Sequence, residues 1–325
     1  MMSARSTPAL RRIARRLPLI SAYERRIAEL TAQVGGLTGA GGDGAPLWVP
    51  PGHFYSPMPP VSELRAREAA IFGRDPLDVP GVDLRVDAQR ALLAQLEPLQ
   101  EGLSFPATEA DARAAGRRYW SENVPFGAGD ALFLTLMLRH LRPQRLIELG
   151  CGFSSACTLD ARDNVLDGAL DLTFVDPYPQ LLETFLRDDD RSTMRVLPTA
   201  TQDVPLDDMR TLAAGDVLFV DSTHVSRTGS DVNRIVFEIL PALTRGVFVH
   251  LHDMFPGFEY PAPWVFEGRA WTELYLVRAF LQYNDAFEIL LWPNLLAMLD
   301  HGDVIGRFPI AAANIGGSLW LRKVR

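Results

Sequence analysis

The sequence predicts an α/β protein built on a doubly wound, mostly parallel sheet. From about residue 117 onward, short and almost wholly apolar segments alternate with segments of helical periodicity. Buried parallel strands are continuous apolar runs, and each needs a crossover helix before the next strand begins. A Gly-x-Gly turn also follows the first of these strands. We therefore expect one sheet domain over residues 117–325.

The elements of this domain follow one another in a regular order. An apolar helix is expected over residues 131–141, immediately before the first strand. The seven expected strands are residues 145–149, 172–175, 194–197, 216–220, 247–251, 287–292 and 318–322. The expected helices between them are residues 154–161, 180–187, 232–243 and 271–283. Each strand is too short and too apolar to stand alone, so the pattern favours a single buried sheet.

The first 116 residues do not follow this alternation. Residues 1–34 are rich in arginine, and apolar residues at Ile20, Tyr23, Ile27 and Leu30 follow helical spacing. This basic helical segment is either a solvated helix, a helix that touches anionic lipid as a peripheral membrane contact, or a helix that pairs with a second copy.

Two further stretches separate that segment from the sheet domain. Residues 35–62 begin as a Gly-rich flexible linker and continue as an arm rich in Pro and aromatic side chains. Residues 63–116 are a helical extension. Its expected helices are residues 64–72, 87–99 and 109–115.

Composition excludes several classes of protein. The 32 basic and 40 acidic residues give a net charge of −8, which argues against a nucleic-acid partner because phosphates require a basic surface. The two cysteines, Cys151 and Cys157, are too few for a disulfide framework and fit a reducing compartment. No apolar run reaches the length of a membrane span. We therefore expect a cytoplasmic protein.

The segment Glu148-Leu-Gly150-Cys-Gly152 is the most informative part of the chain. It places a tight turn at the carboxyl end of the first strand, where open α/β sheets bind ligands. Asp176 ends the second strand, the position from which an acidic group holds ribose hydroxyls. A dinucleotide fingerprint would carry a third glycine where this chain has Ser155, and the acidic Glu148 suits a cationic ligand better than a pyrophosphate.

These residues resemble the first motif of class I S-adenosylmethionine-dependent methyltransferases, and Asp176 resembles that family's second-strand acid. The resemblance covers residues 117–325 and implies a seven-stranded, Rossmann-like domain that binds S-adenosyl-L-methionine. Many members carry a third glycine where this chain has Ser154. The implied cofactor-binding residues are Glu148, Gly150, Cys151, Gly152, Ser154, Asp176, Gln202, Asp203 and Asp221.

Acids and histidines follow the next two strands of the sheet. Asp221 and His224 follow residues 216–220, and His252 and Asp253 follow residues 247–251. Neighbouring parallel strands end at the same edge, so these side chains are expected to converge beside the glycine turn. Two carboxylates suit Mg²⁺ or another hard divalent ion, and a neutral imidazole accepts a proton from a hydroxyl.

The spacing D-x-x-H followed by H-D resembles a metal-dependent subgroup that methylates sugar hydroxyls of macrolides. By that resemblance Asp221 and Asp253 are metal ligands, and His224 is the general base. We add His252 as a candidate ligand, whereas a core or loop position is favoured for His250. The loop that follows, residues 254–273, is expected to cover the acceptor.

The expected function is an S-adenosylmethionine-dependent O-methyltransferase acting on a hydroxyl of a sugar or a glycosylated or small metabolite. A divalent metal such as Mg²⁺ is expected to assist, and a homo-oligomer is expected. Three alternatives remain open from the sequence. The first is a metal-independent methyltransferase in which His224 acts alone. The second is a dinucleotide-dependent oxidoreductase, and the third is a non-catalytic module that keeps the cofactor fold.

Overall fold

The computed structural model describes residues 48–325. The sequence-based expectations for residues 1–34 and for the linker that follows lie outside these described residues. Two compact units divide the chain, and the boundary falls between Pro59 and Pro60. In the described part of the first unit, the side chains of Trp48, Phe54 and Tyr55 are exposed, and the rings of Trp48 and Tyr55 lie 5.2 Å apart.

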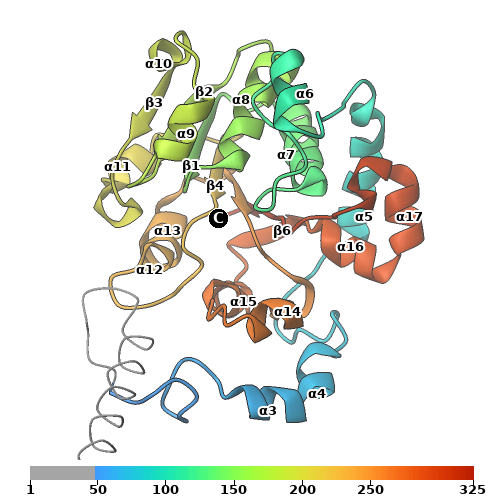
Figure 1. Cartoon of the computed structure of the whole chain (residues 1–325), viewed down its shortest axis with the longest axis vertical. Coiled ribbons are helices and arrows are strands. Elements are labelled where there is room, and N and C mark those ends of the chain that lie inside the picture. Colours follow the sequence, from blue (N-terminus) through green and yellow to red (C-terminus); the bar gives the residue numbers. More distant parts are fainter. Residues whose placement is uncertain (1–47) are drawn as a thin grey trace, which may run out of the picture. The chain divides into compact units, whose positions relative to one another are not determined.

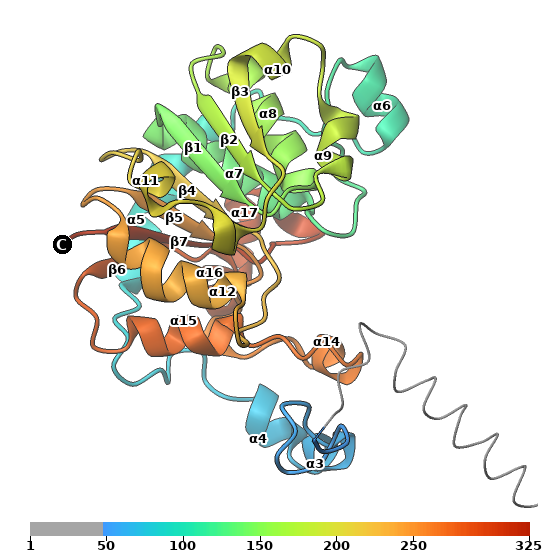
Figure 2. The same ribbon diagram turned by 90° about the vertical axis from the view of Figure 1, so that its left-hand side faces the viewer.

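The second unit, residues 60–325, contains one seven-stranded sheet with helices on both faces (Figures 1 and 2). Its strands are β1 (Arg145–Leu149), β2 (Asp171–Val175), β3 (Met194–Leu197), β4 (Val217–Val220), β5 (Phe248–Leu251), β6 (Phe287–Leu291) and β7 (Leu319–Lys323). The order across the sheet is β3-β2-β1-β4-β5-β7-β6. The first five strands are parallel, and β7 is antiparallel to both β5 and β6. The predicted fold class is confirmed.

Alternation along the strands divides the core into two layers. On β1, Leu146 faces one layer and Ile147 the other, because successive side chains point to opposite faces. The first layer packs under α5 (Val86–Leu96), α7 (Ala128–Leu141), α8 (Phe153–Val165), α16 (Pro293–Leu299) and α17 (His301–Arg307). The second packs under α11 (Leu206–Met209), α12 (Asp231–Arg234), η3 (Ile235–Ile239), α13 (Leu240–Ala242) and α15 (Glu273–Leu281).

The strand order has a topological switch point between β1 and β4. From β1 the chain continues to β2 on one side of this point, and from β4 it continues to β5 on the other side. Open α/β sheets bind ligands beyond the carboxyl ends of the strands at such a point. The glycine turn after β1 and the acidic segment after β4 therefore lie where a ligand is expected.

Helix boundaries differ from expectation at three places in the chain. The helix expected over residues 64–72 is two short helices, α3 (Val61–Ala66) and α4 (Glu68–Phe72), which meet at Arg67. The helix expected over residues 232–243 contains the π-helical segment η3. The helix expected from residue 271 starts at Glu273, because Trp271 and Thr272 contact another loop.

The remaining short helices are η1 (Glu97–Gln100), α6 (Glu109–Ala114), α9 (Gln180–Phe185), α10 (Asp190–Thr193), η2 (Thr201–Asp203), η4 (Pro256–Phe258), α14 (Ala262–Phe266) and η5 (Pro309–Ala312). Leu92, Leu93 and Leu96 of α5 are buried in the same core as α7, so this part of the helical extension packs on the sheet. Within residues 48–325, no helix is both long enough and apolar enough to cross a bilayer.

Candidate functional site

The turn after β1 can be built only with glycine at its first position. Gly150 has a φ of +87°, and a Cβ there would lie 1.8 Å from the carbonyl oxygen of Asp221. The turn is therefore pressed directly against the end of β4. Helix α8 begins at Phe153, and the backbone N–H of Gly152 donates to the Ser155 hydroxyl at 3.1 Å.

Glu148 supports this turn from inside the protein. Its carboxyl accepts hydrogen bonds from the hydroxyls of Ser154 and Ser155, both at 2.7 Å, and its side chain is fully buried. Burial raises the pKa of Glu148 to about 8, because the hydroxyls only partly replace the water that a carboxylate requires. Glu148 does not line the neighbouring cavity, so it fixes the turn and the start of α8.

A cavity of about 450 Å³ opens beside the glycine turn. The turn, Asp176, Gln202 and Asp221 line it, together with Phe126, Tyr178 and Asp231. Asp176 accepts hydrogen bonds from the backbone N–H of Cys151 at 2.8 Å and of Tyr178 at 2.6 Å. Gln202 donates to the Gly229 carbonyl at 3.2 Å.

All charged side chains that line this cavity are negative. Three aspartates line it, Asp176, Asp221 and Asp231, and its lining contains no lysine, arginine or histidine. The cavity thus favours a ligand that carries positive charge and hydroxyl groups. Asp203, which the sequence placed with Gln202, is exposed and is not part of the lining.

His224 lies next to Asp221 at the end of β4 and is almost fully buried. Its Nδ1 is 2.8 Å from Glu273 Oε2. Its Nε2 faces Asp221 Oδ1 at 3.5 Å and Asp253 Oδ2 at 3.6 Å. Burial alone would lower the pKa of His224, but the hydrogen bonds to Asp221 and Glu273 outweigh it and raise the pKa well above 6.5.

A segment 47 or more residues further along the chain holds His224 in place. The Trp271 ring packs on the imidazole with centroids 4.5 Å apart. The backbone N–H groups of Thr272 and Glu273 donate to the His224 carbonyl at 2.9 Å and 3.0 Å. The backbone of His224 has a φ of +59°, a sparsely populated conformation for a non-glycine residue. Sequence reasoning missed Glu273, because an acid in the first turn of a helix is also an ordinary helix-capping residue.

His252 and Asp253 reach the same edge from β5. His252 Nε2 lies 3.5 Å from Asp253 Oδ1, and its Nδ1 lies 3.8 Å from Asp130 Oδ1. Burial lowers the pKa of His252, but the carboxylates of Asp221 and Asp253 more than compensate and raise it to about 9. Asp253, like His224, has a positive φ, at +57°.

Two of the predicted metal ligands, Asp221 and Asp253, both lie close to Nε2 of His224, at 3.5 Å and 3.6 Å. Across residues 48–325, no three His, Cys, Asp or Glu side chains are arranged to hold a metal ion. Asp221 and Asp253 instead face imidazole nitrogens. A metal at Asp221, His252 and Asp253 stays a sequence-based prediction without support from this geometry.

His250 does not belong to the site. Its ring is stacked between Phe219 at 4.2 Å and Trp320 at 4.6 Å, and neither ring nitrogen has a hydrogen-bond partner. Burial lowers the pKa of His250 well below 6.5, so the ring is neutral. This buried, stacked position agrees with the prediction that His250 is a core residue.

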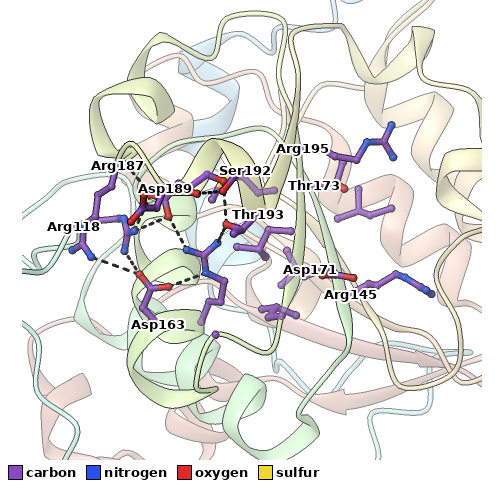
Figure 3. A pocket seen from close by; sticks show the side chains of 18 of the residues that line it. Arg118, Arg145, Asp163, Asp171, Thr173, Arg187, Asp189, Ser192, Thr193 and Arg195 are labelled. Carbon is purple, nitrogen blue, oxygen red and sulfur yellow. Dashed lines mark hydrogen bonds and ion pairs between the residues drawn. The ribbon is translucent and has the colours of Figure 1, made fainter.

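A larger cavity, of about 1140 Å³, lies at the opposite ends of β1, β2 and β3 (Figure 3). Arg118 donates there to Asp163 at 2.6 Å and to Asp190 at 2.8 Å, and Arg162 also donates to Asp190, at 2.7 Å. These buried arginines are neutralised by carboxylates of the same protein. Neither the turn after β1 nor the His224 cluster contributes to this cavity.

Residues 147–254 match the model of a family described as "Methyltransferase domain". A protein of Archaeoglobus fulgidus described as "Uncharacterized protein" is 34% identical over 132 residues. That alignment covers 40% of this chain and 58% of the relative, so the chain spans little more than half of that protein. The residues that match the methyltransferase-domain model contain the glycine turn, Asp176, His224 and Asp253.

Several solved structures match parts of this chain at low sequence identity. The apo structure of CmcI-N160 is 20% identical with a TM-score of 0.38, and the similarity covers 61% of this chain and 71% of that one. The S-adenosylhomocysteine-bound Podospora anserina methyltransferase PaMTH1 is 14% identical with a TM-score of 0.41, covering 82% and 95%. The O-methyltransferase TomG from Streptomyces achromogenes, in complex with S-adenosylmethionine, is 15% identical with a TM-score of 0.39, covering 73% and 98%.

Proposed function

We propose that this protein is an S-adenosylmethionine-dependent O-methyltransferase that acts on a hydroxyl of a sugar or other small metabolite, with His224 as the general base. One observation carries the proposal. The cavity beside the glycine turn is lined by three aspartates and by no cationic side chain, and one of these aspartates, Asp221, faces His224.

The cavity suits a sulfonium nucleoside better than a dinucleotide. The carboxylate of Asp176 has lone pairs left after accepting two backbone N–H groups, and these are available to ribose hydroxyls. The glycine turn lets the backbone approach the methionine part closely. A pyrophosphate would place its charges among carboxylates, which is unfavourable and argues against the oxidoreductase alternative.

In the proposed reaction, the hydrogen bond to Glu273 fixes the proton of His224 on Nδ1. The lone pair of Nε2 then faces the side where Asp221 and Asp253 lie. The acceptor hydroxyl gives its proton to Nε2 while its oxygen forms a bond to the methyl carbon. The bond from carbon to sulfur breaks, and its electron pair stays on sulfur, which leaves as S-adenosylhomocysteine. The imidazolium that forms is stabilised by the surrounding carboxylates.

The same carboxylates hold a proton on His224 in the protein without cofactor, because they raise its pKa. A sulfonium cation in the neighbouring cavity would offset part of their negative charge. Cofactor binding would then lower the pKa of His224 and prepare the ring to act as a base.

Calorimetric titration of the full chain with S-adenosylmethionine, S-adenosylhomocysteine and NAD tests the cofactor. We expect S-adenosylmethionine to bind at least a hundredfold more tightly than NAD. Tighter binding of NAD would overturn the proposal. Release of S-adenosylhomocysteine in the presence of a panel of sugar and aromatic alcohols tests catalysis. Cofactor binding without transfer to any acceptor would favour the non-catalytic module instead.

The mechanism above runs without a metal. A divalent ion such as Mg²⁺ at Asp221, His252 and Asp253 is a separate expectation from the sequence. Dialysis against EDTA followed by an activity measurement tests it. Loss of turnover that Mg²⁺ restores would support a metal, and unchanged turnover would leave His224 acting alone. Gel filtration likewise tests the expected homo-oligomer, with and without residues 1–34. A cytoplasmic location also remains an expectation from the sequence alone.

A further inference from the structure

A third cavity, of about 360 Å³, lies within the second unit, away from the glycine turn. Residues of α4, of η4 and the loop that follows it, of α15 and of α16 enclose it. Its walls carry five aromatic rings, Phe72, Phe255, Phe258, Tyr260 and Tyr275. A cavity of this size and lining is typical of sites for small, flat organic molecules.

Two arginines reach this aromatic cavity, and neither forms an ion pair with any residue the structure describes. Arg278 on α15 is half-buried, and Arg74 after α4 is exposed and uses its Nε to donate to the Ala70 carbonyl at 3.1 Å. This contrasts with Arg118 and Arg162, whose guanidinium groups face carboxylates. The guanidinium groups of Arg74 and Arg278 are therefore available to pair with an anionic group of a ligand.

The one carboxylate of the cavity is already engaged. Glu259 accepts hydrogen bonds from the Tyr275 hydroxyl and from the backbone N–H of Tyr260. Two guanidinium groups against one such carboxylate leave the lining with an excess of positive charge. The wall next to Glu259 also holds an unusual backbone, because Gly257 and Phe258 have successive positive φ angles of +73° and +55°. Strained backbone of this kind is frequent at ligand-binding sites.

We propose that this cavity binds a planar aromatic carboxylate. The rings provide flat apolar walls, and a guanidinium group pairs with a carboxylate through two parallel hydrogen bonds. A neutral aromatic molecule would leave both arginines unpaired, and an aromatic cation would be repelled by them. The ligand class is therefore set by the combination of rings and unpaired arginines.

The site is distinct from the place of methyl transfer. Tyr260 lines the cavity, and its ring lies 6.0 Å from Trp271, which in turn packs on His224. The Tyr260 hydroxyl accepts a hydrogen bond from the backbone N–H of Leu274 at 3.1 Å, which fixes this ring between the two sites. A ligand in the cavity does not contact His224, so the inference is independent of the proposed methyltransferase activity.

Titration of the full chain with 2-naphthoate and its neutral amide, followed by calorimetry or saturation-transfer NMR, tests the inference. We expect saturable binding of 2-naphthoate with a Kd of about 1 mM, the range for a ligand of this size. The amide should bind roughly tenfold more weakly, because it cannot form a charge-assisted pair. An excess of S-adenosylhomocysteine should not displace the naphthoate.

Substitutions locate the binding. Arg278→Met keeps an extended side chain without the charge and should weaken 2-naphthoate roughly tenfold. Arg245→Met, which removes an exposed arginine outside the cavity, should leave the Kd unchanged. If Arg278→Met does not fold, Arg74→Met provides the same comparison. Equal binding of naphthoate and amide, displacement by S-adenosylhomocysteine, or an unchanged Kd in the folded cavity variants would each overturn the inference.

Discussion

The two edges of the sheet carry cavities of opposite character. At the amino ends of β1, β2 and β3, the larger cavity contains buried arginines that are matched by aspartates, as Figure 3 shows for Arg118 and Asp163. At the carboxyl ends, the smaller cavity has three aspartates and no cationic side chain in its lining. The residues beside it, His224 and Asp253, also hold positive φ angles.

This difference favours the cavity at the carboxyl ends as the ligand site because of the charge of its lining, although its volume is the smaller of the two. In the larger cavity, the buried arginines and aspartates neutralise one another, so this network requires no charged ligand. An excess of carboxylates around an empty volume is unfavourable until a cation enters. We therefore expect substitutions at the amino edge to change stability, and substitutions at the carboxyl edge to change binding and turnover.

The largest effect is expected for His224→Ala. If His224 is the base, as proposed, its removal slows proton transfer, and turnover should fall by about 10²- to 10⁴-fold. The affinity for S-adenosylmethionine should change less than threefold, because His224 does not line the cavity. Release of S-adenosylhomocysteine measures the first quantity and calorimetry the second. His301→Ala, on the start of α17, is the matched control and should leave turnover unchanged.

Glu273→Gln sharpens the same prediction, because it removes a charge that raises the pKa of His224. The general base is active when deprotonated, so wild-type kcat/KM should rise with pH above 6.5. The variant should reach its plateau at lower pH. An identical pH profile in both proteins would contradict the role given to Glu273 as a positioning residue.

Arg118→Met tests the amino edge. It removes the only arginine of residues 48–325 that pairs with Asp160 and one of the two that pair with Asp190, which keeps Arg162, so the free energy of unfolding should fall by about 3 kcal/mol. Urea denaturation measures the loss. Arg195→Met is the control, because its pair with Asp208 is exposed and long, at 3.7 Å, and is expected to contribute less than about 1 kcal/mol. A large change in cofactor affinity in Arg118→Met would break the distinction between the two edges.

Glu148→Gln should change how stability depends on pH. The carboxyl of Glu148 has a pKa of about 8 in the fold, above its ordinary value of 4.5, so the folded state holds this proton more tightly than the unfolded state. Its contribution is fully present below pH 4.5 and is lost as the pH rises through 8. Between those limits, the stability of the variant relative to wild type should increase by up to about 1.4 kcal/mol per pH unit. Urea denaturation from pH 5 to 9 tests this, and parallel curves would contradict it.

The smallest effect is expected for Asp176→Asn. The neutral amide weakens the hydrogen bonds to ribose, so the Kd for S-adenosylmethionine should rise about tenfold. Stability should change little, because Asn still accepts one of the two backbone hydrogen bonds. Asp189→Asn makes the same change in the opposite cavity and should leave the Kd unaltered. An equal rise of the Kd in Asp176→Asn and Asp189→Asn would contradict the assignment of cofactor binding to the cavity at the carboxyl ends.

Local pattern was sufficient to predict the sheet and its glycine turn. Buried strands and the Gly-x-Gly turn are properties of a few consecutive residues, and the shared edge of parallel strands brought Asp221, His224 and Asp253 together as expected. Gln202 likewise lines the cavity, whereas Asp203 one residue later does not.

The parts that were missed depend on side-chain contacts that the sequence pattern does not specify. Glu273 lies 49 residues beyond His224, and no local pattern links the two. Glu148 was expected to bind the cofactor, but the hydroxyls of Ser154 and Ser155 turn it into a buried support. The late start of α15 at Glu273 similarly follows from the contacts of Trp271 and Thr272 with His224, which a linear pattern does not contain.

The segment between Asp253 and Trp271 is attached to His224 at both of its ends. Asp253 faces His224 at the start, and Trp271, Thr272 and Glu273 contact the same histidine at the end. The intervening stretch also reaches this histidine indirectly, because the rings of Tyr260 and Trp264 lie 6.0 Å and 5.4 Å from Trp271. An exchange of residues 256–268 that removes these two rings is therefore expected to disturb the position of His224 as well as the aromatic cavity.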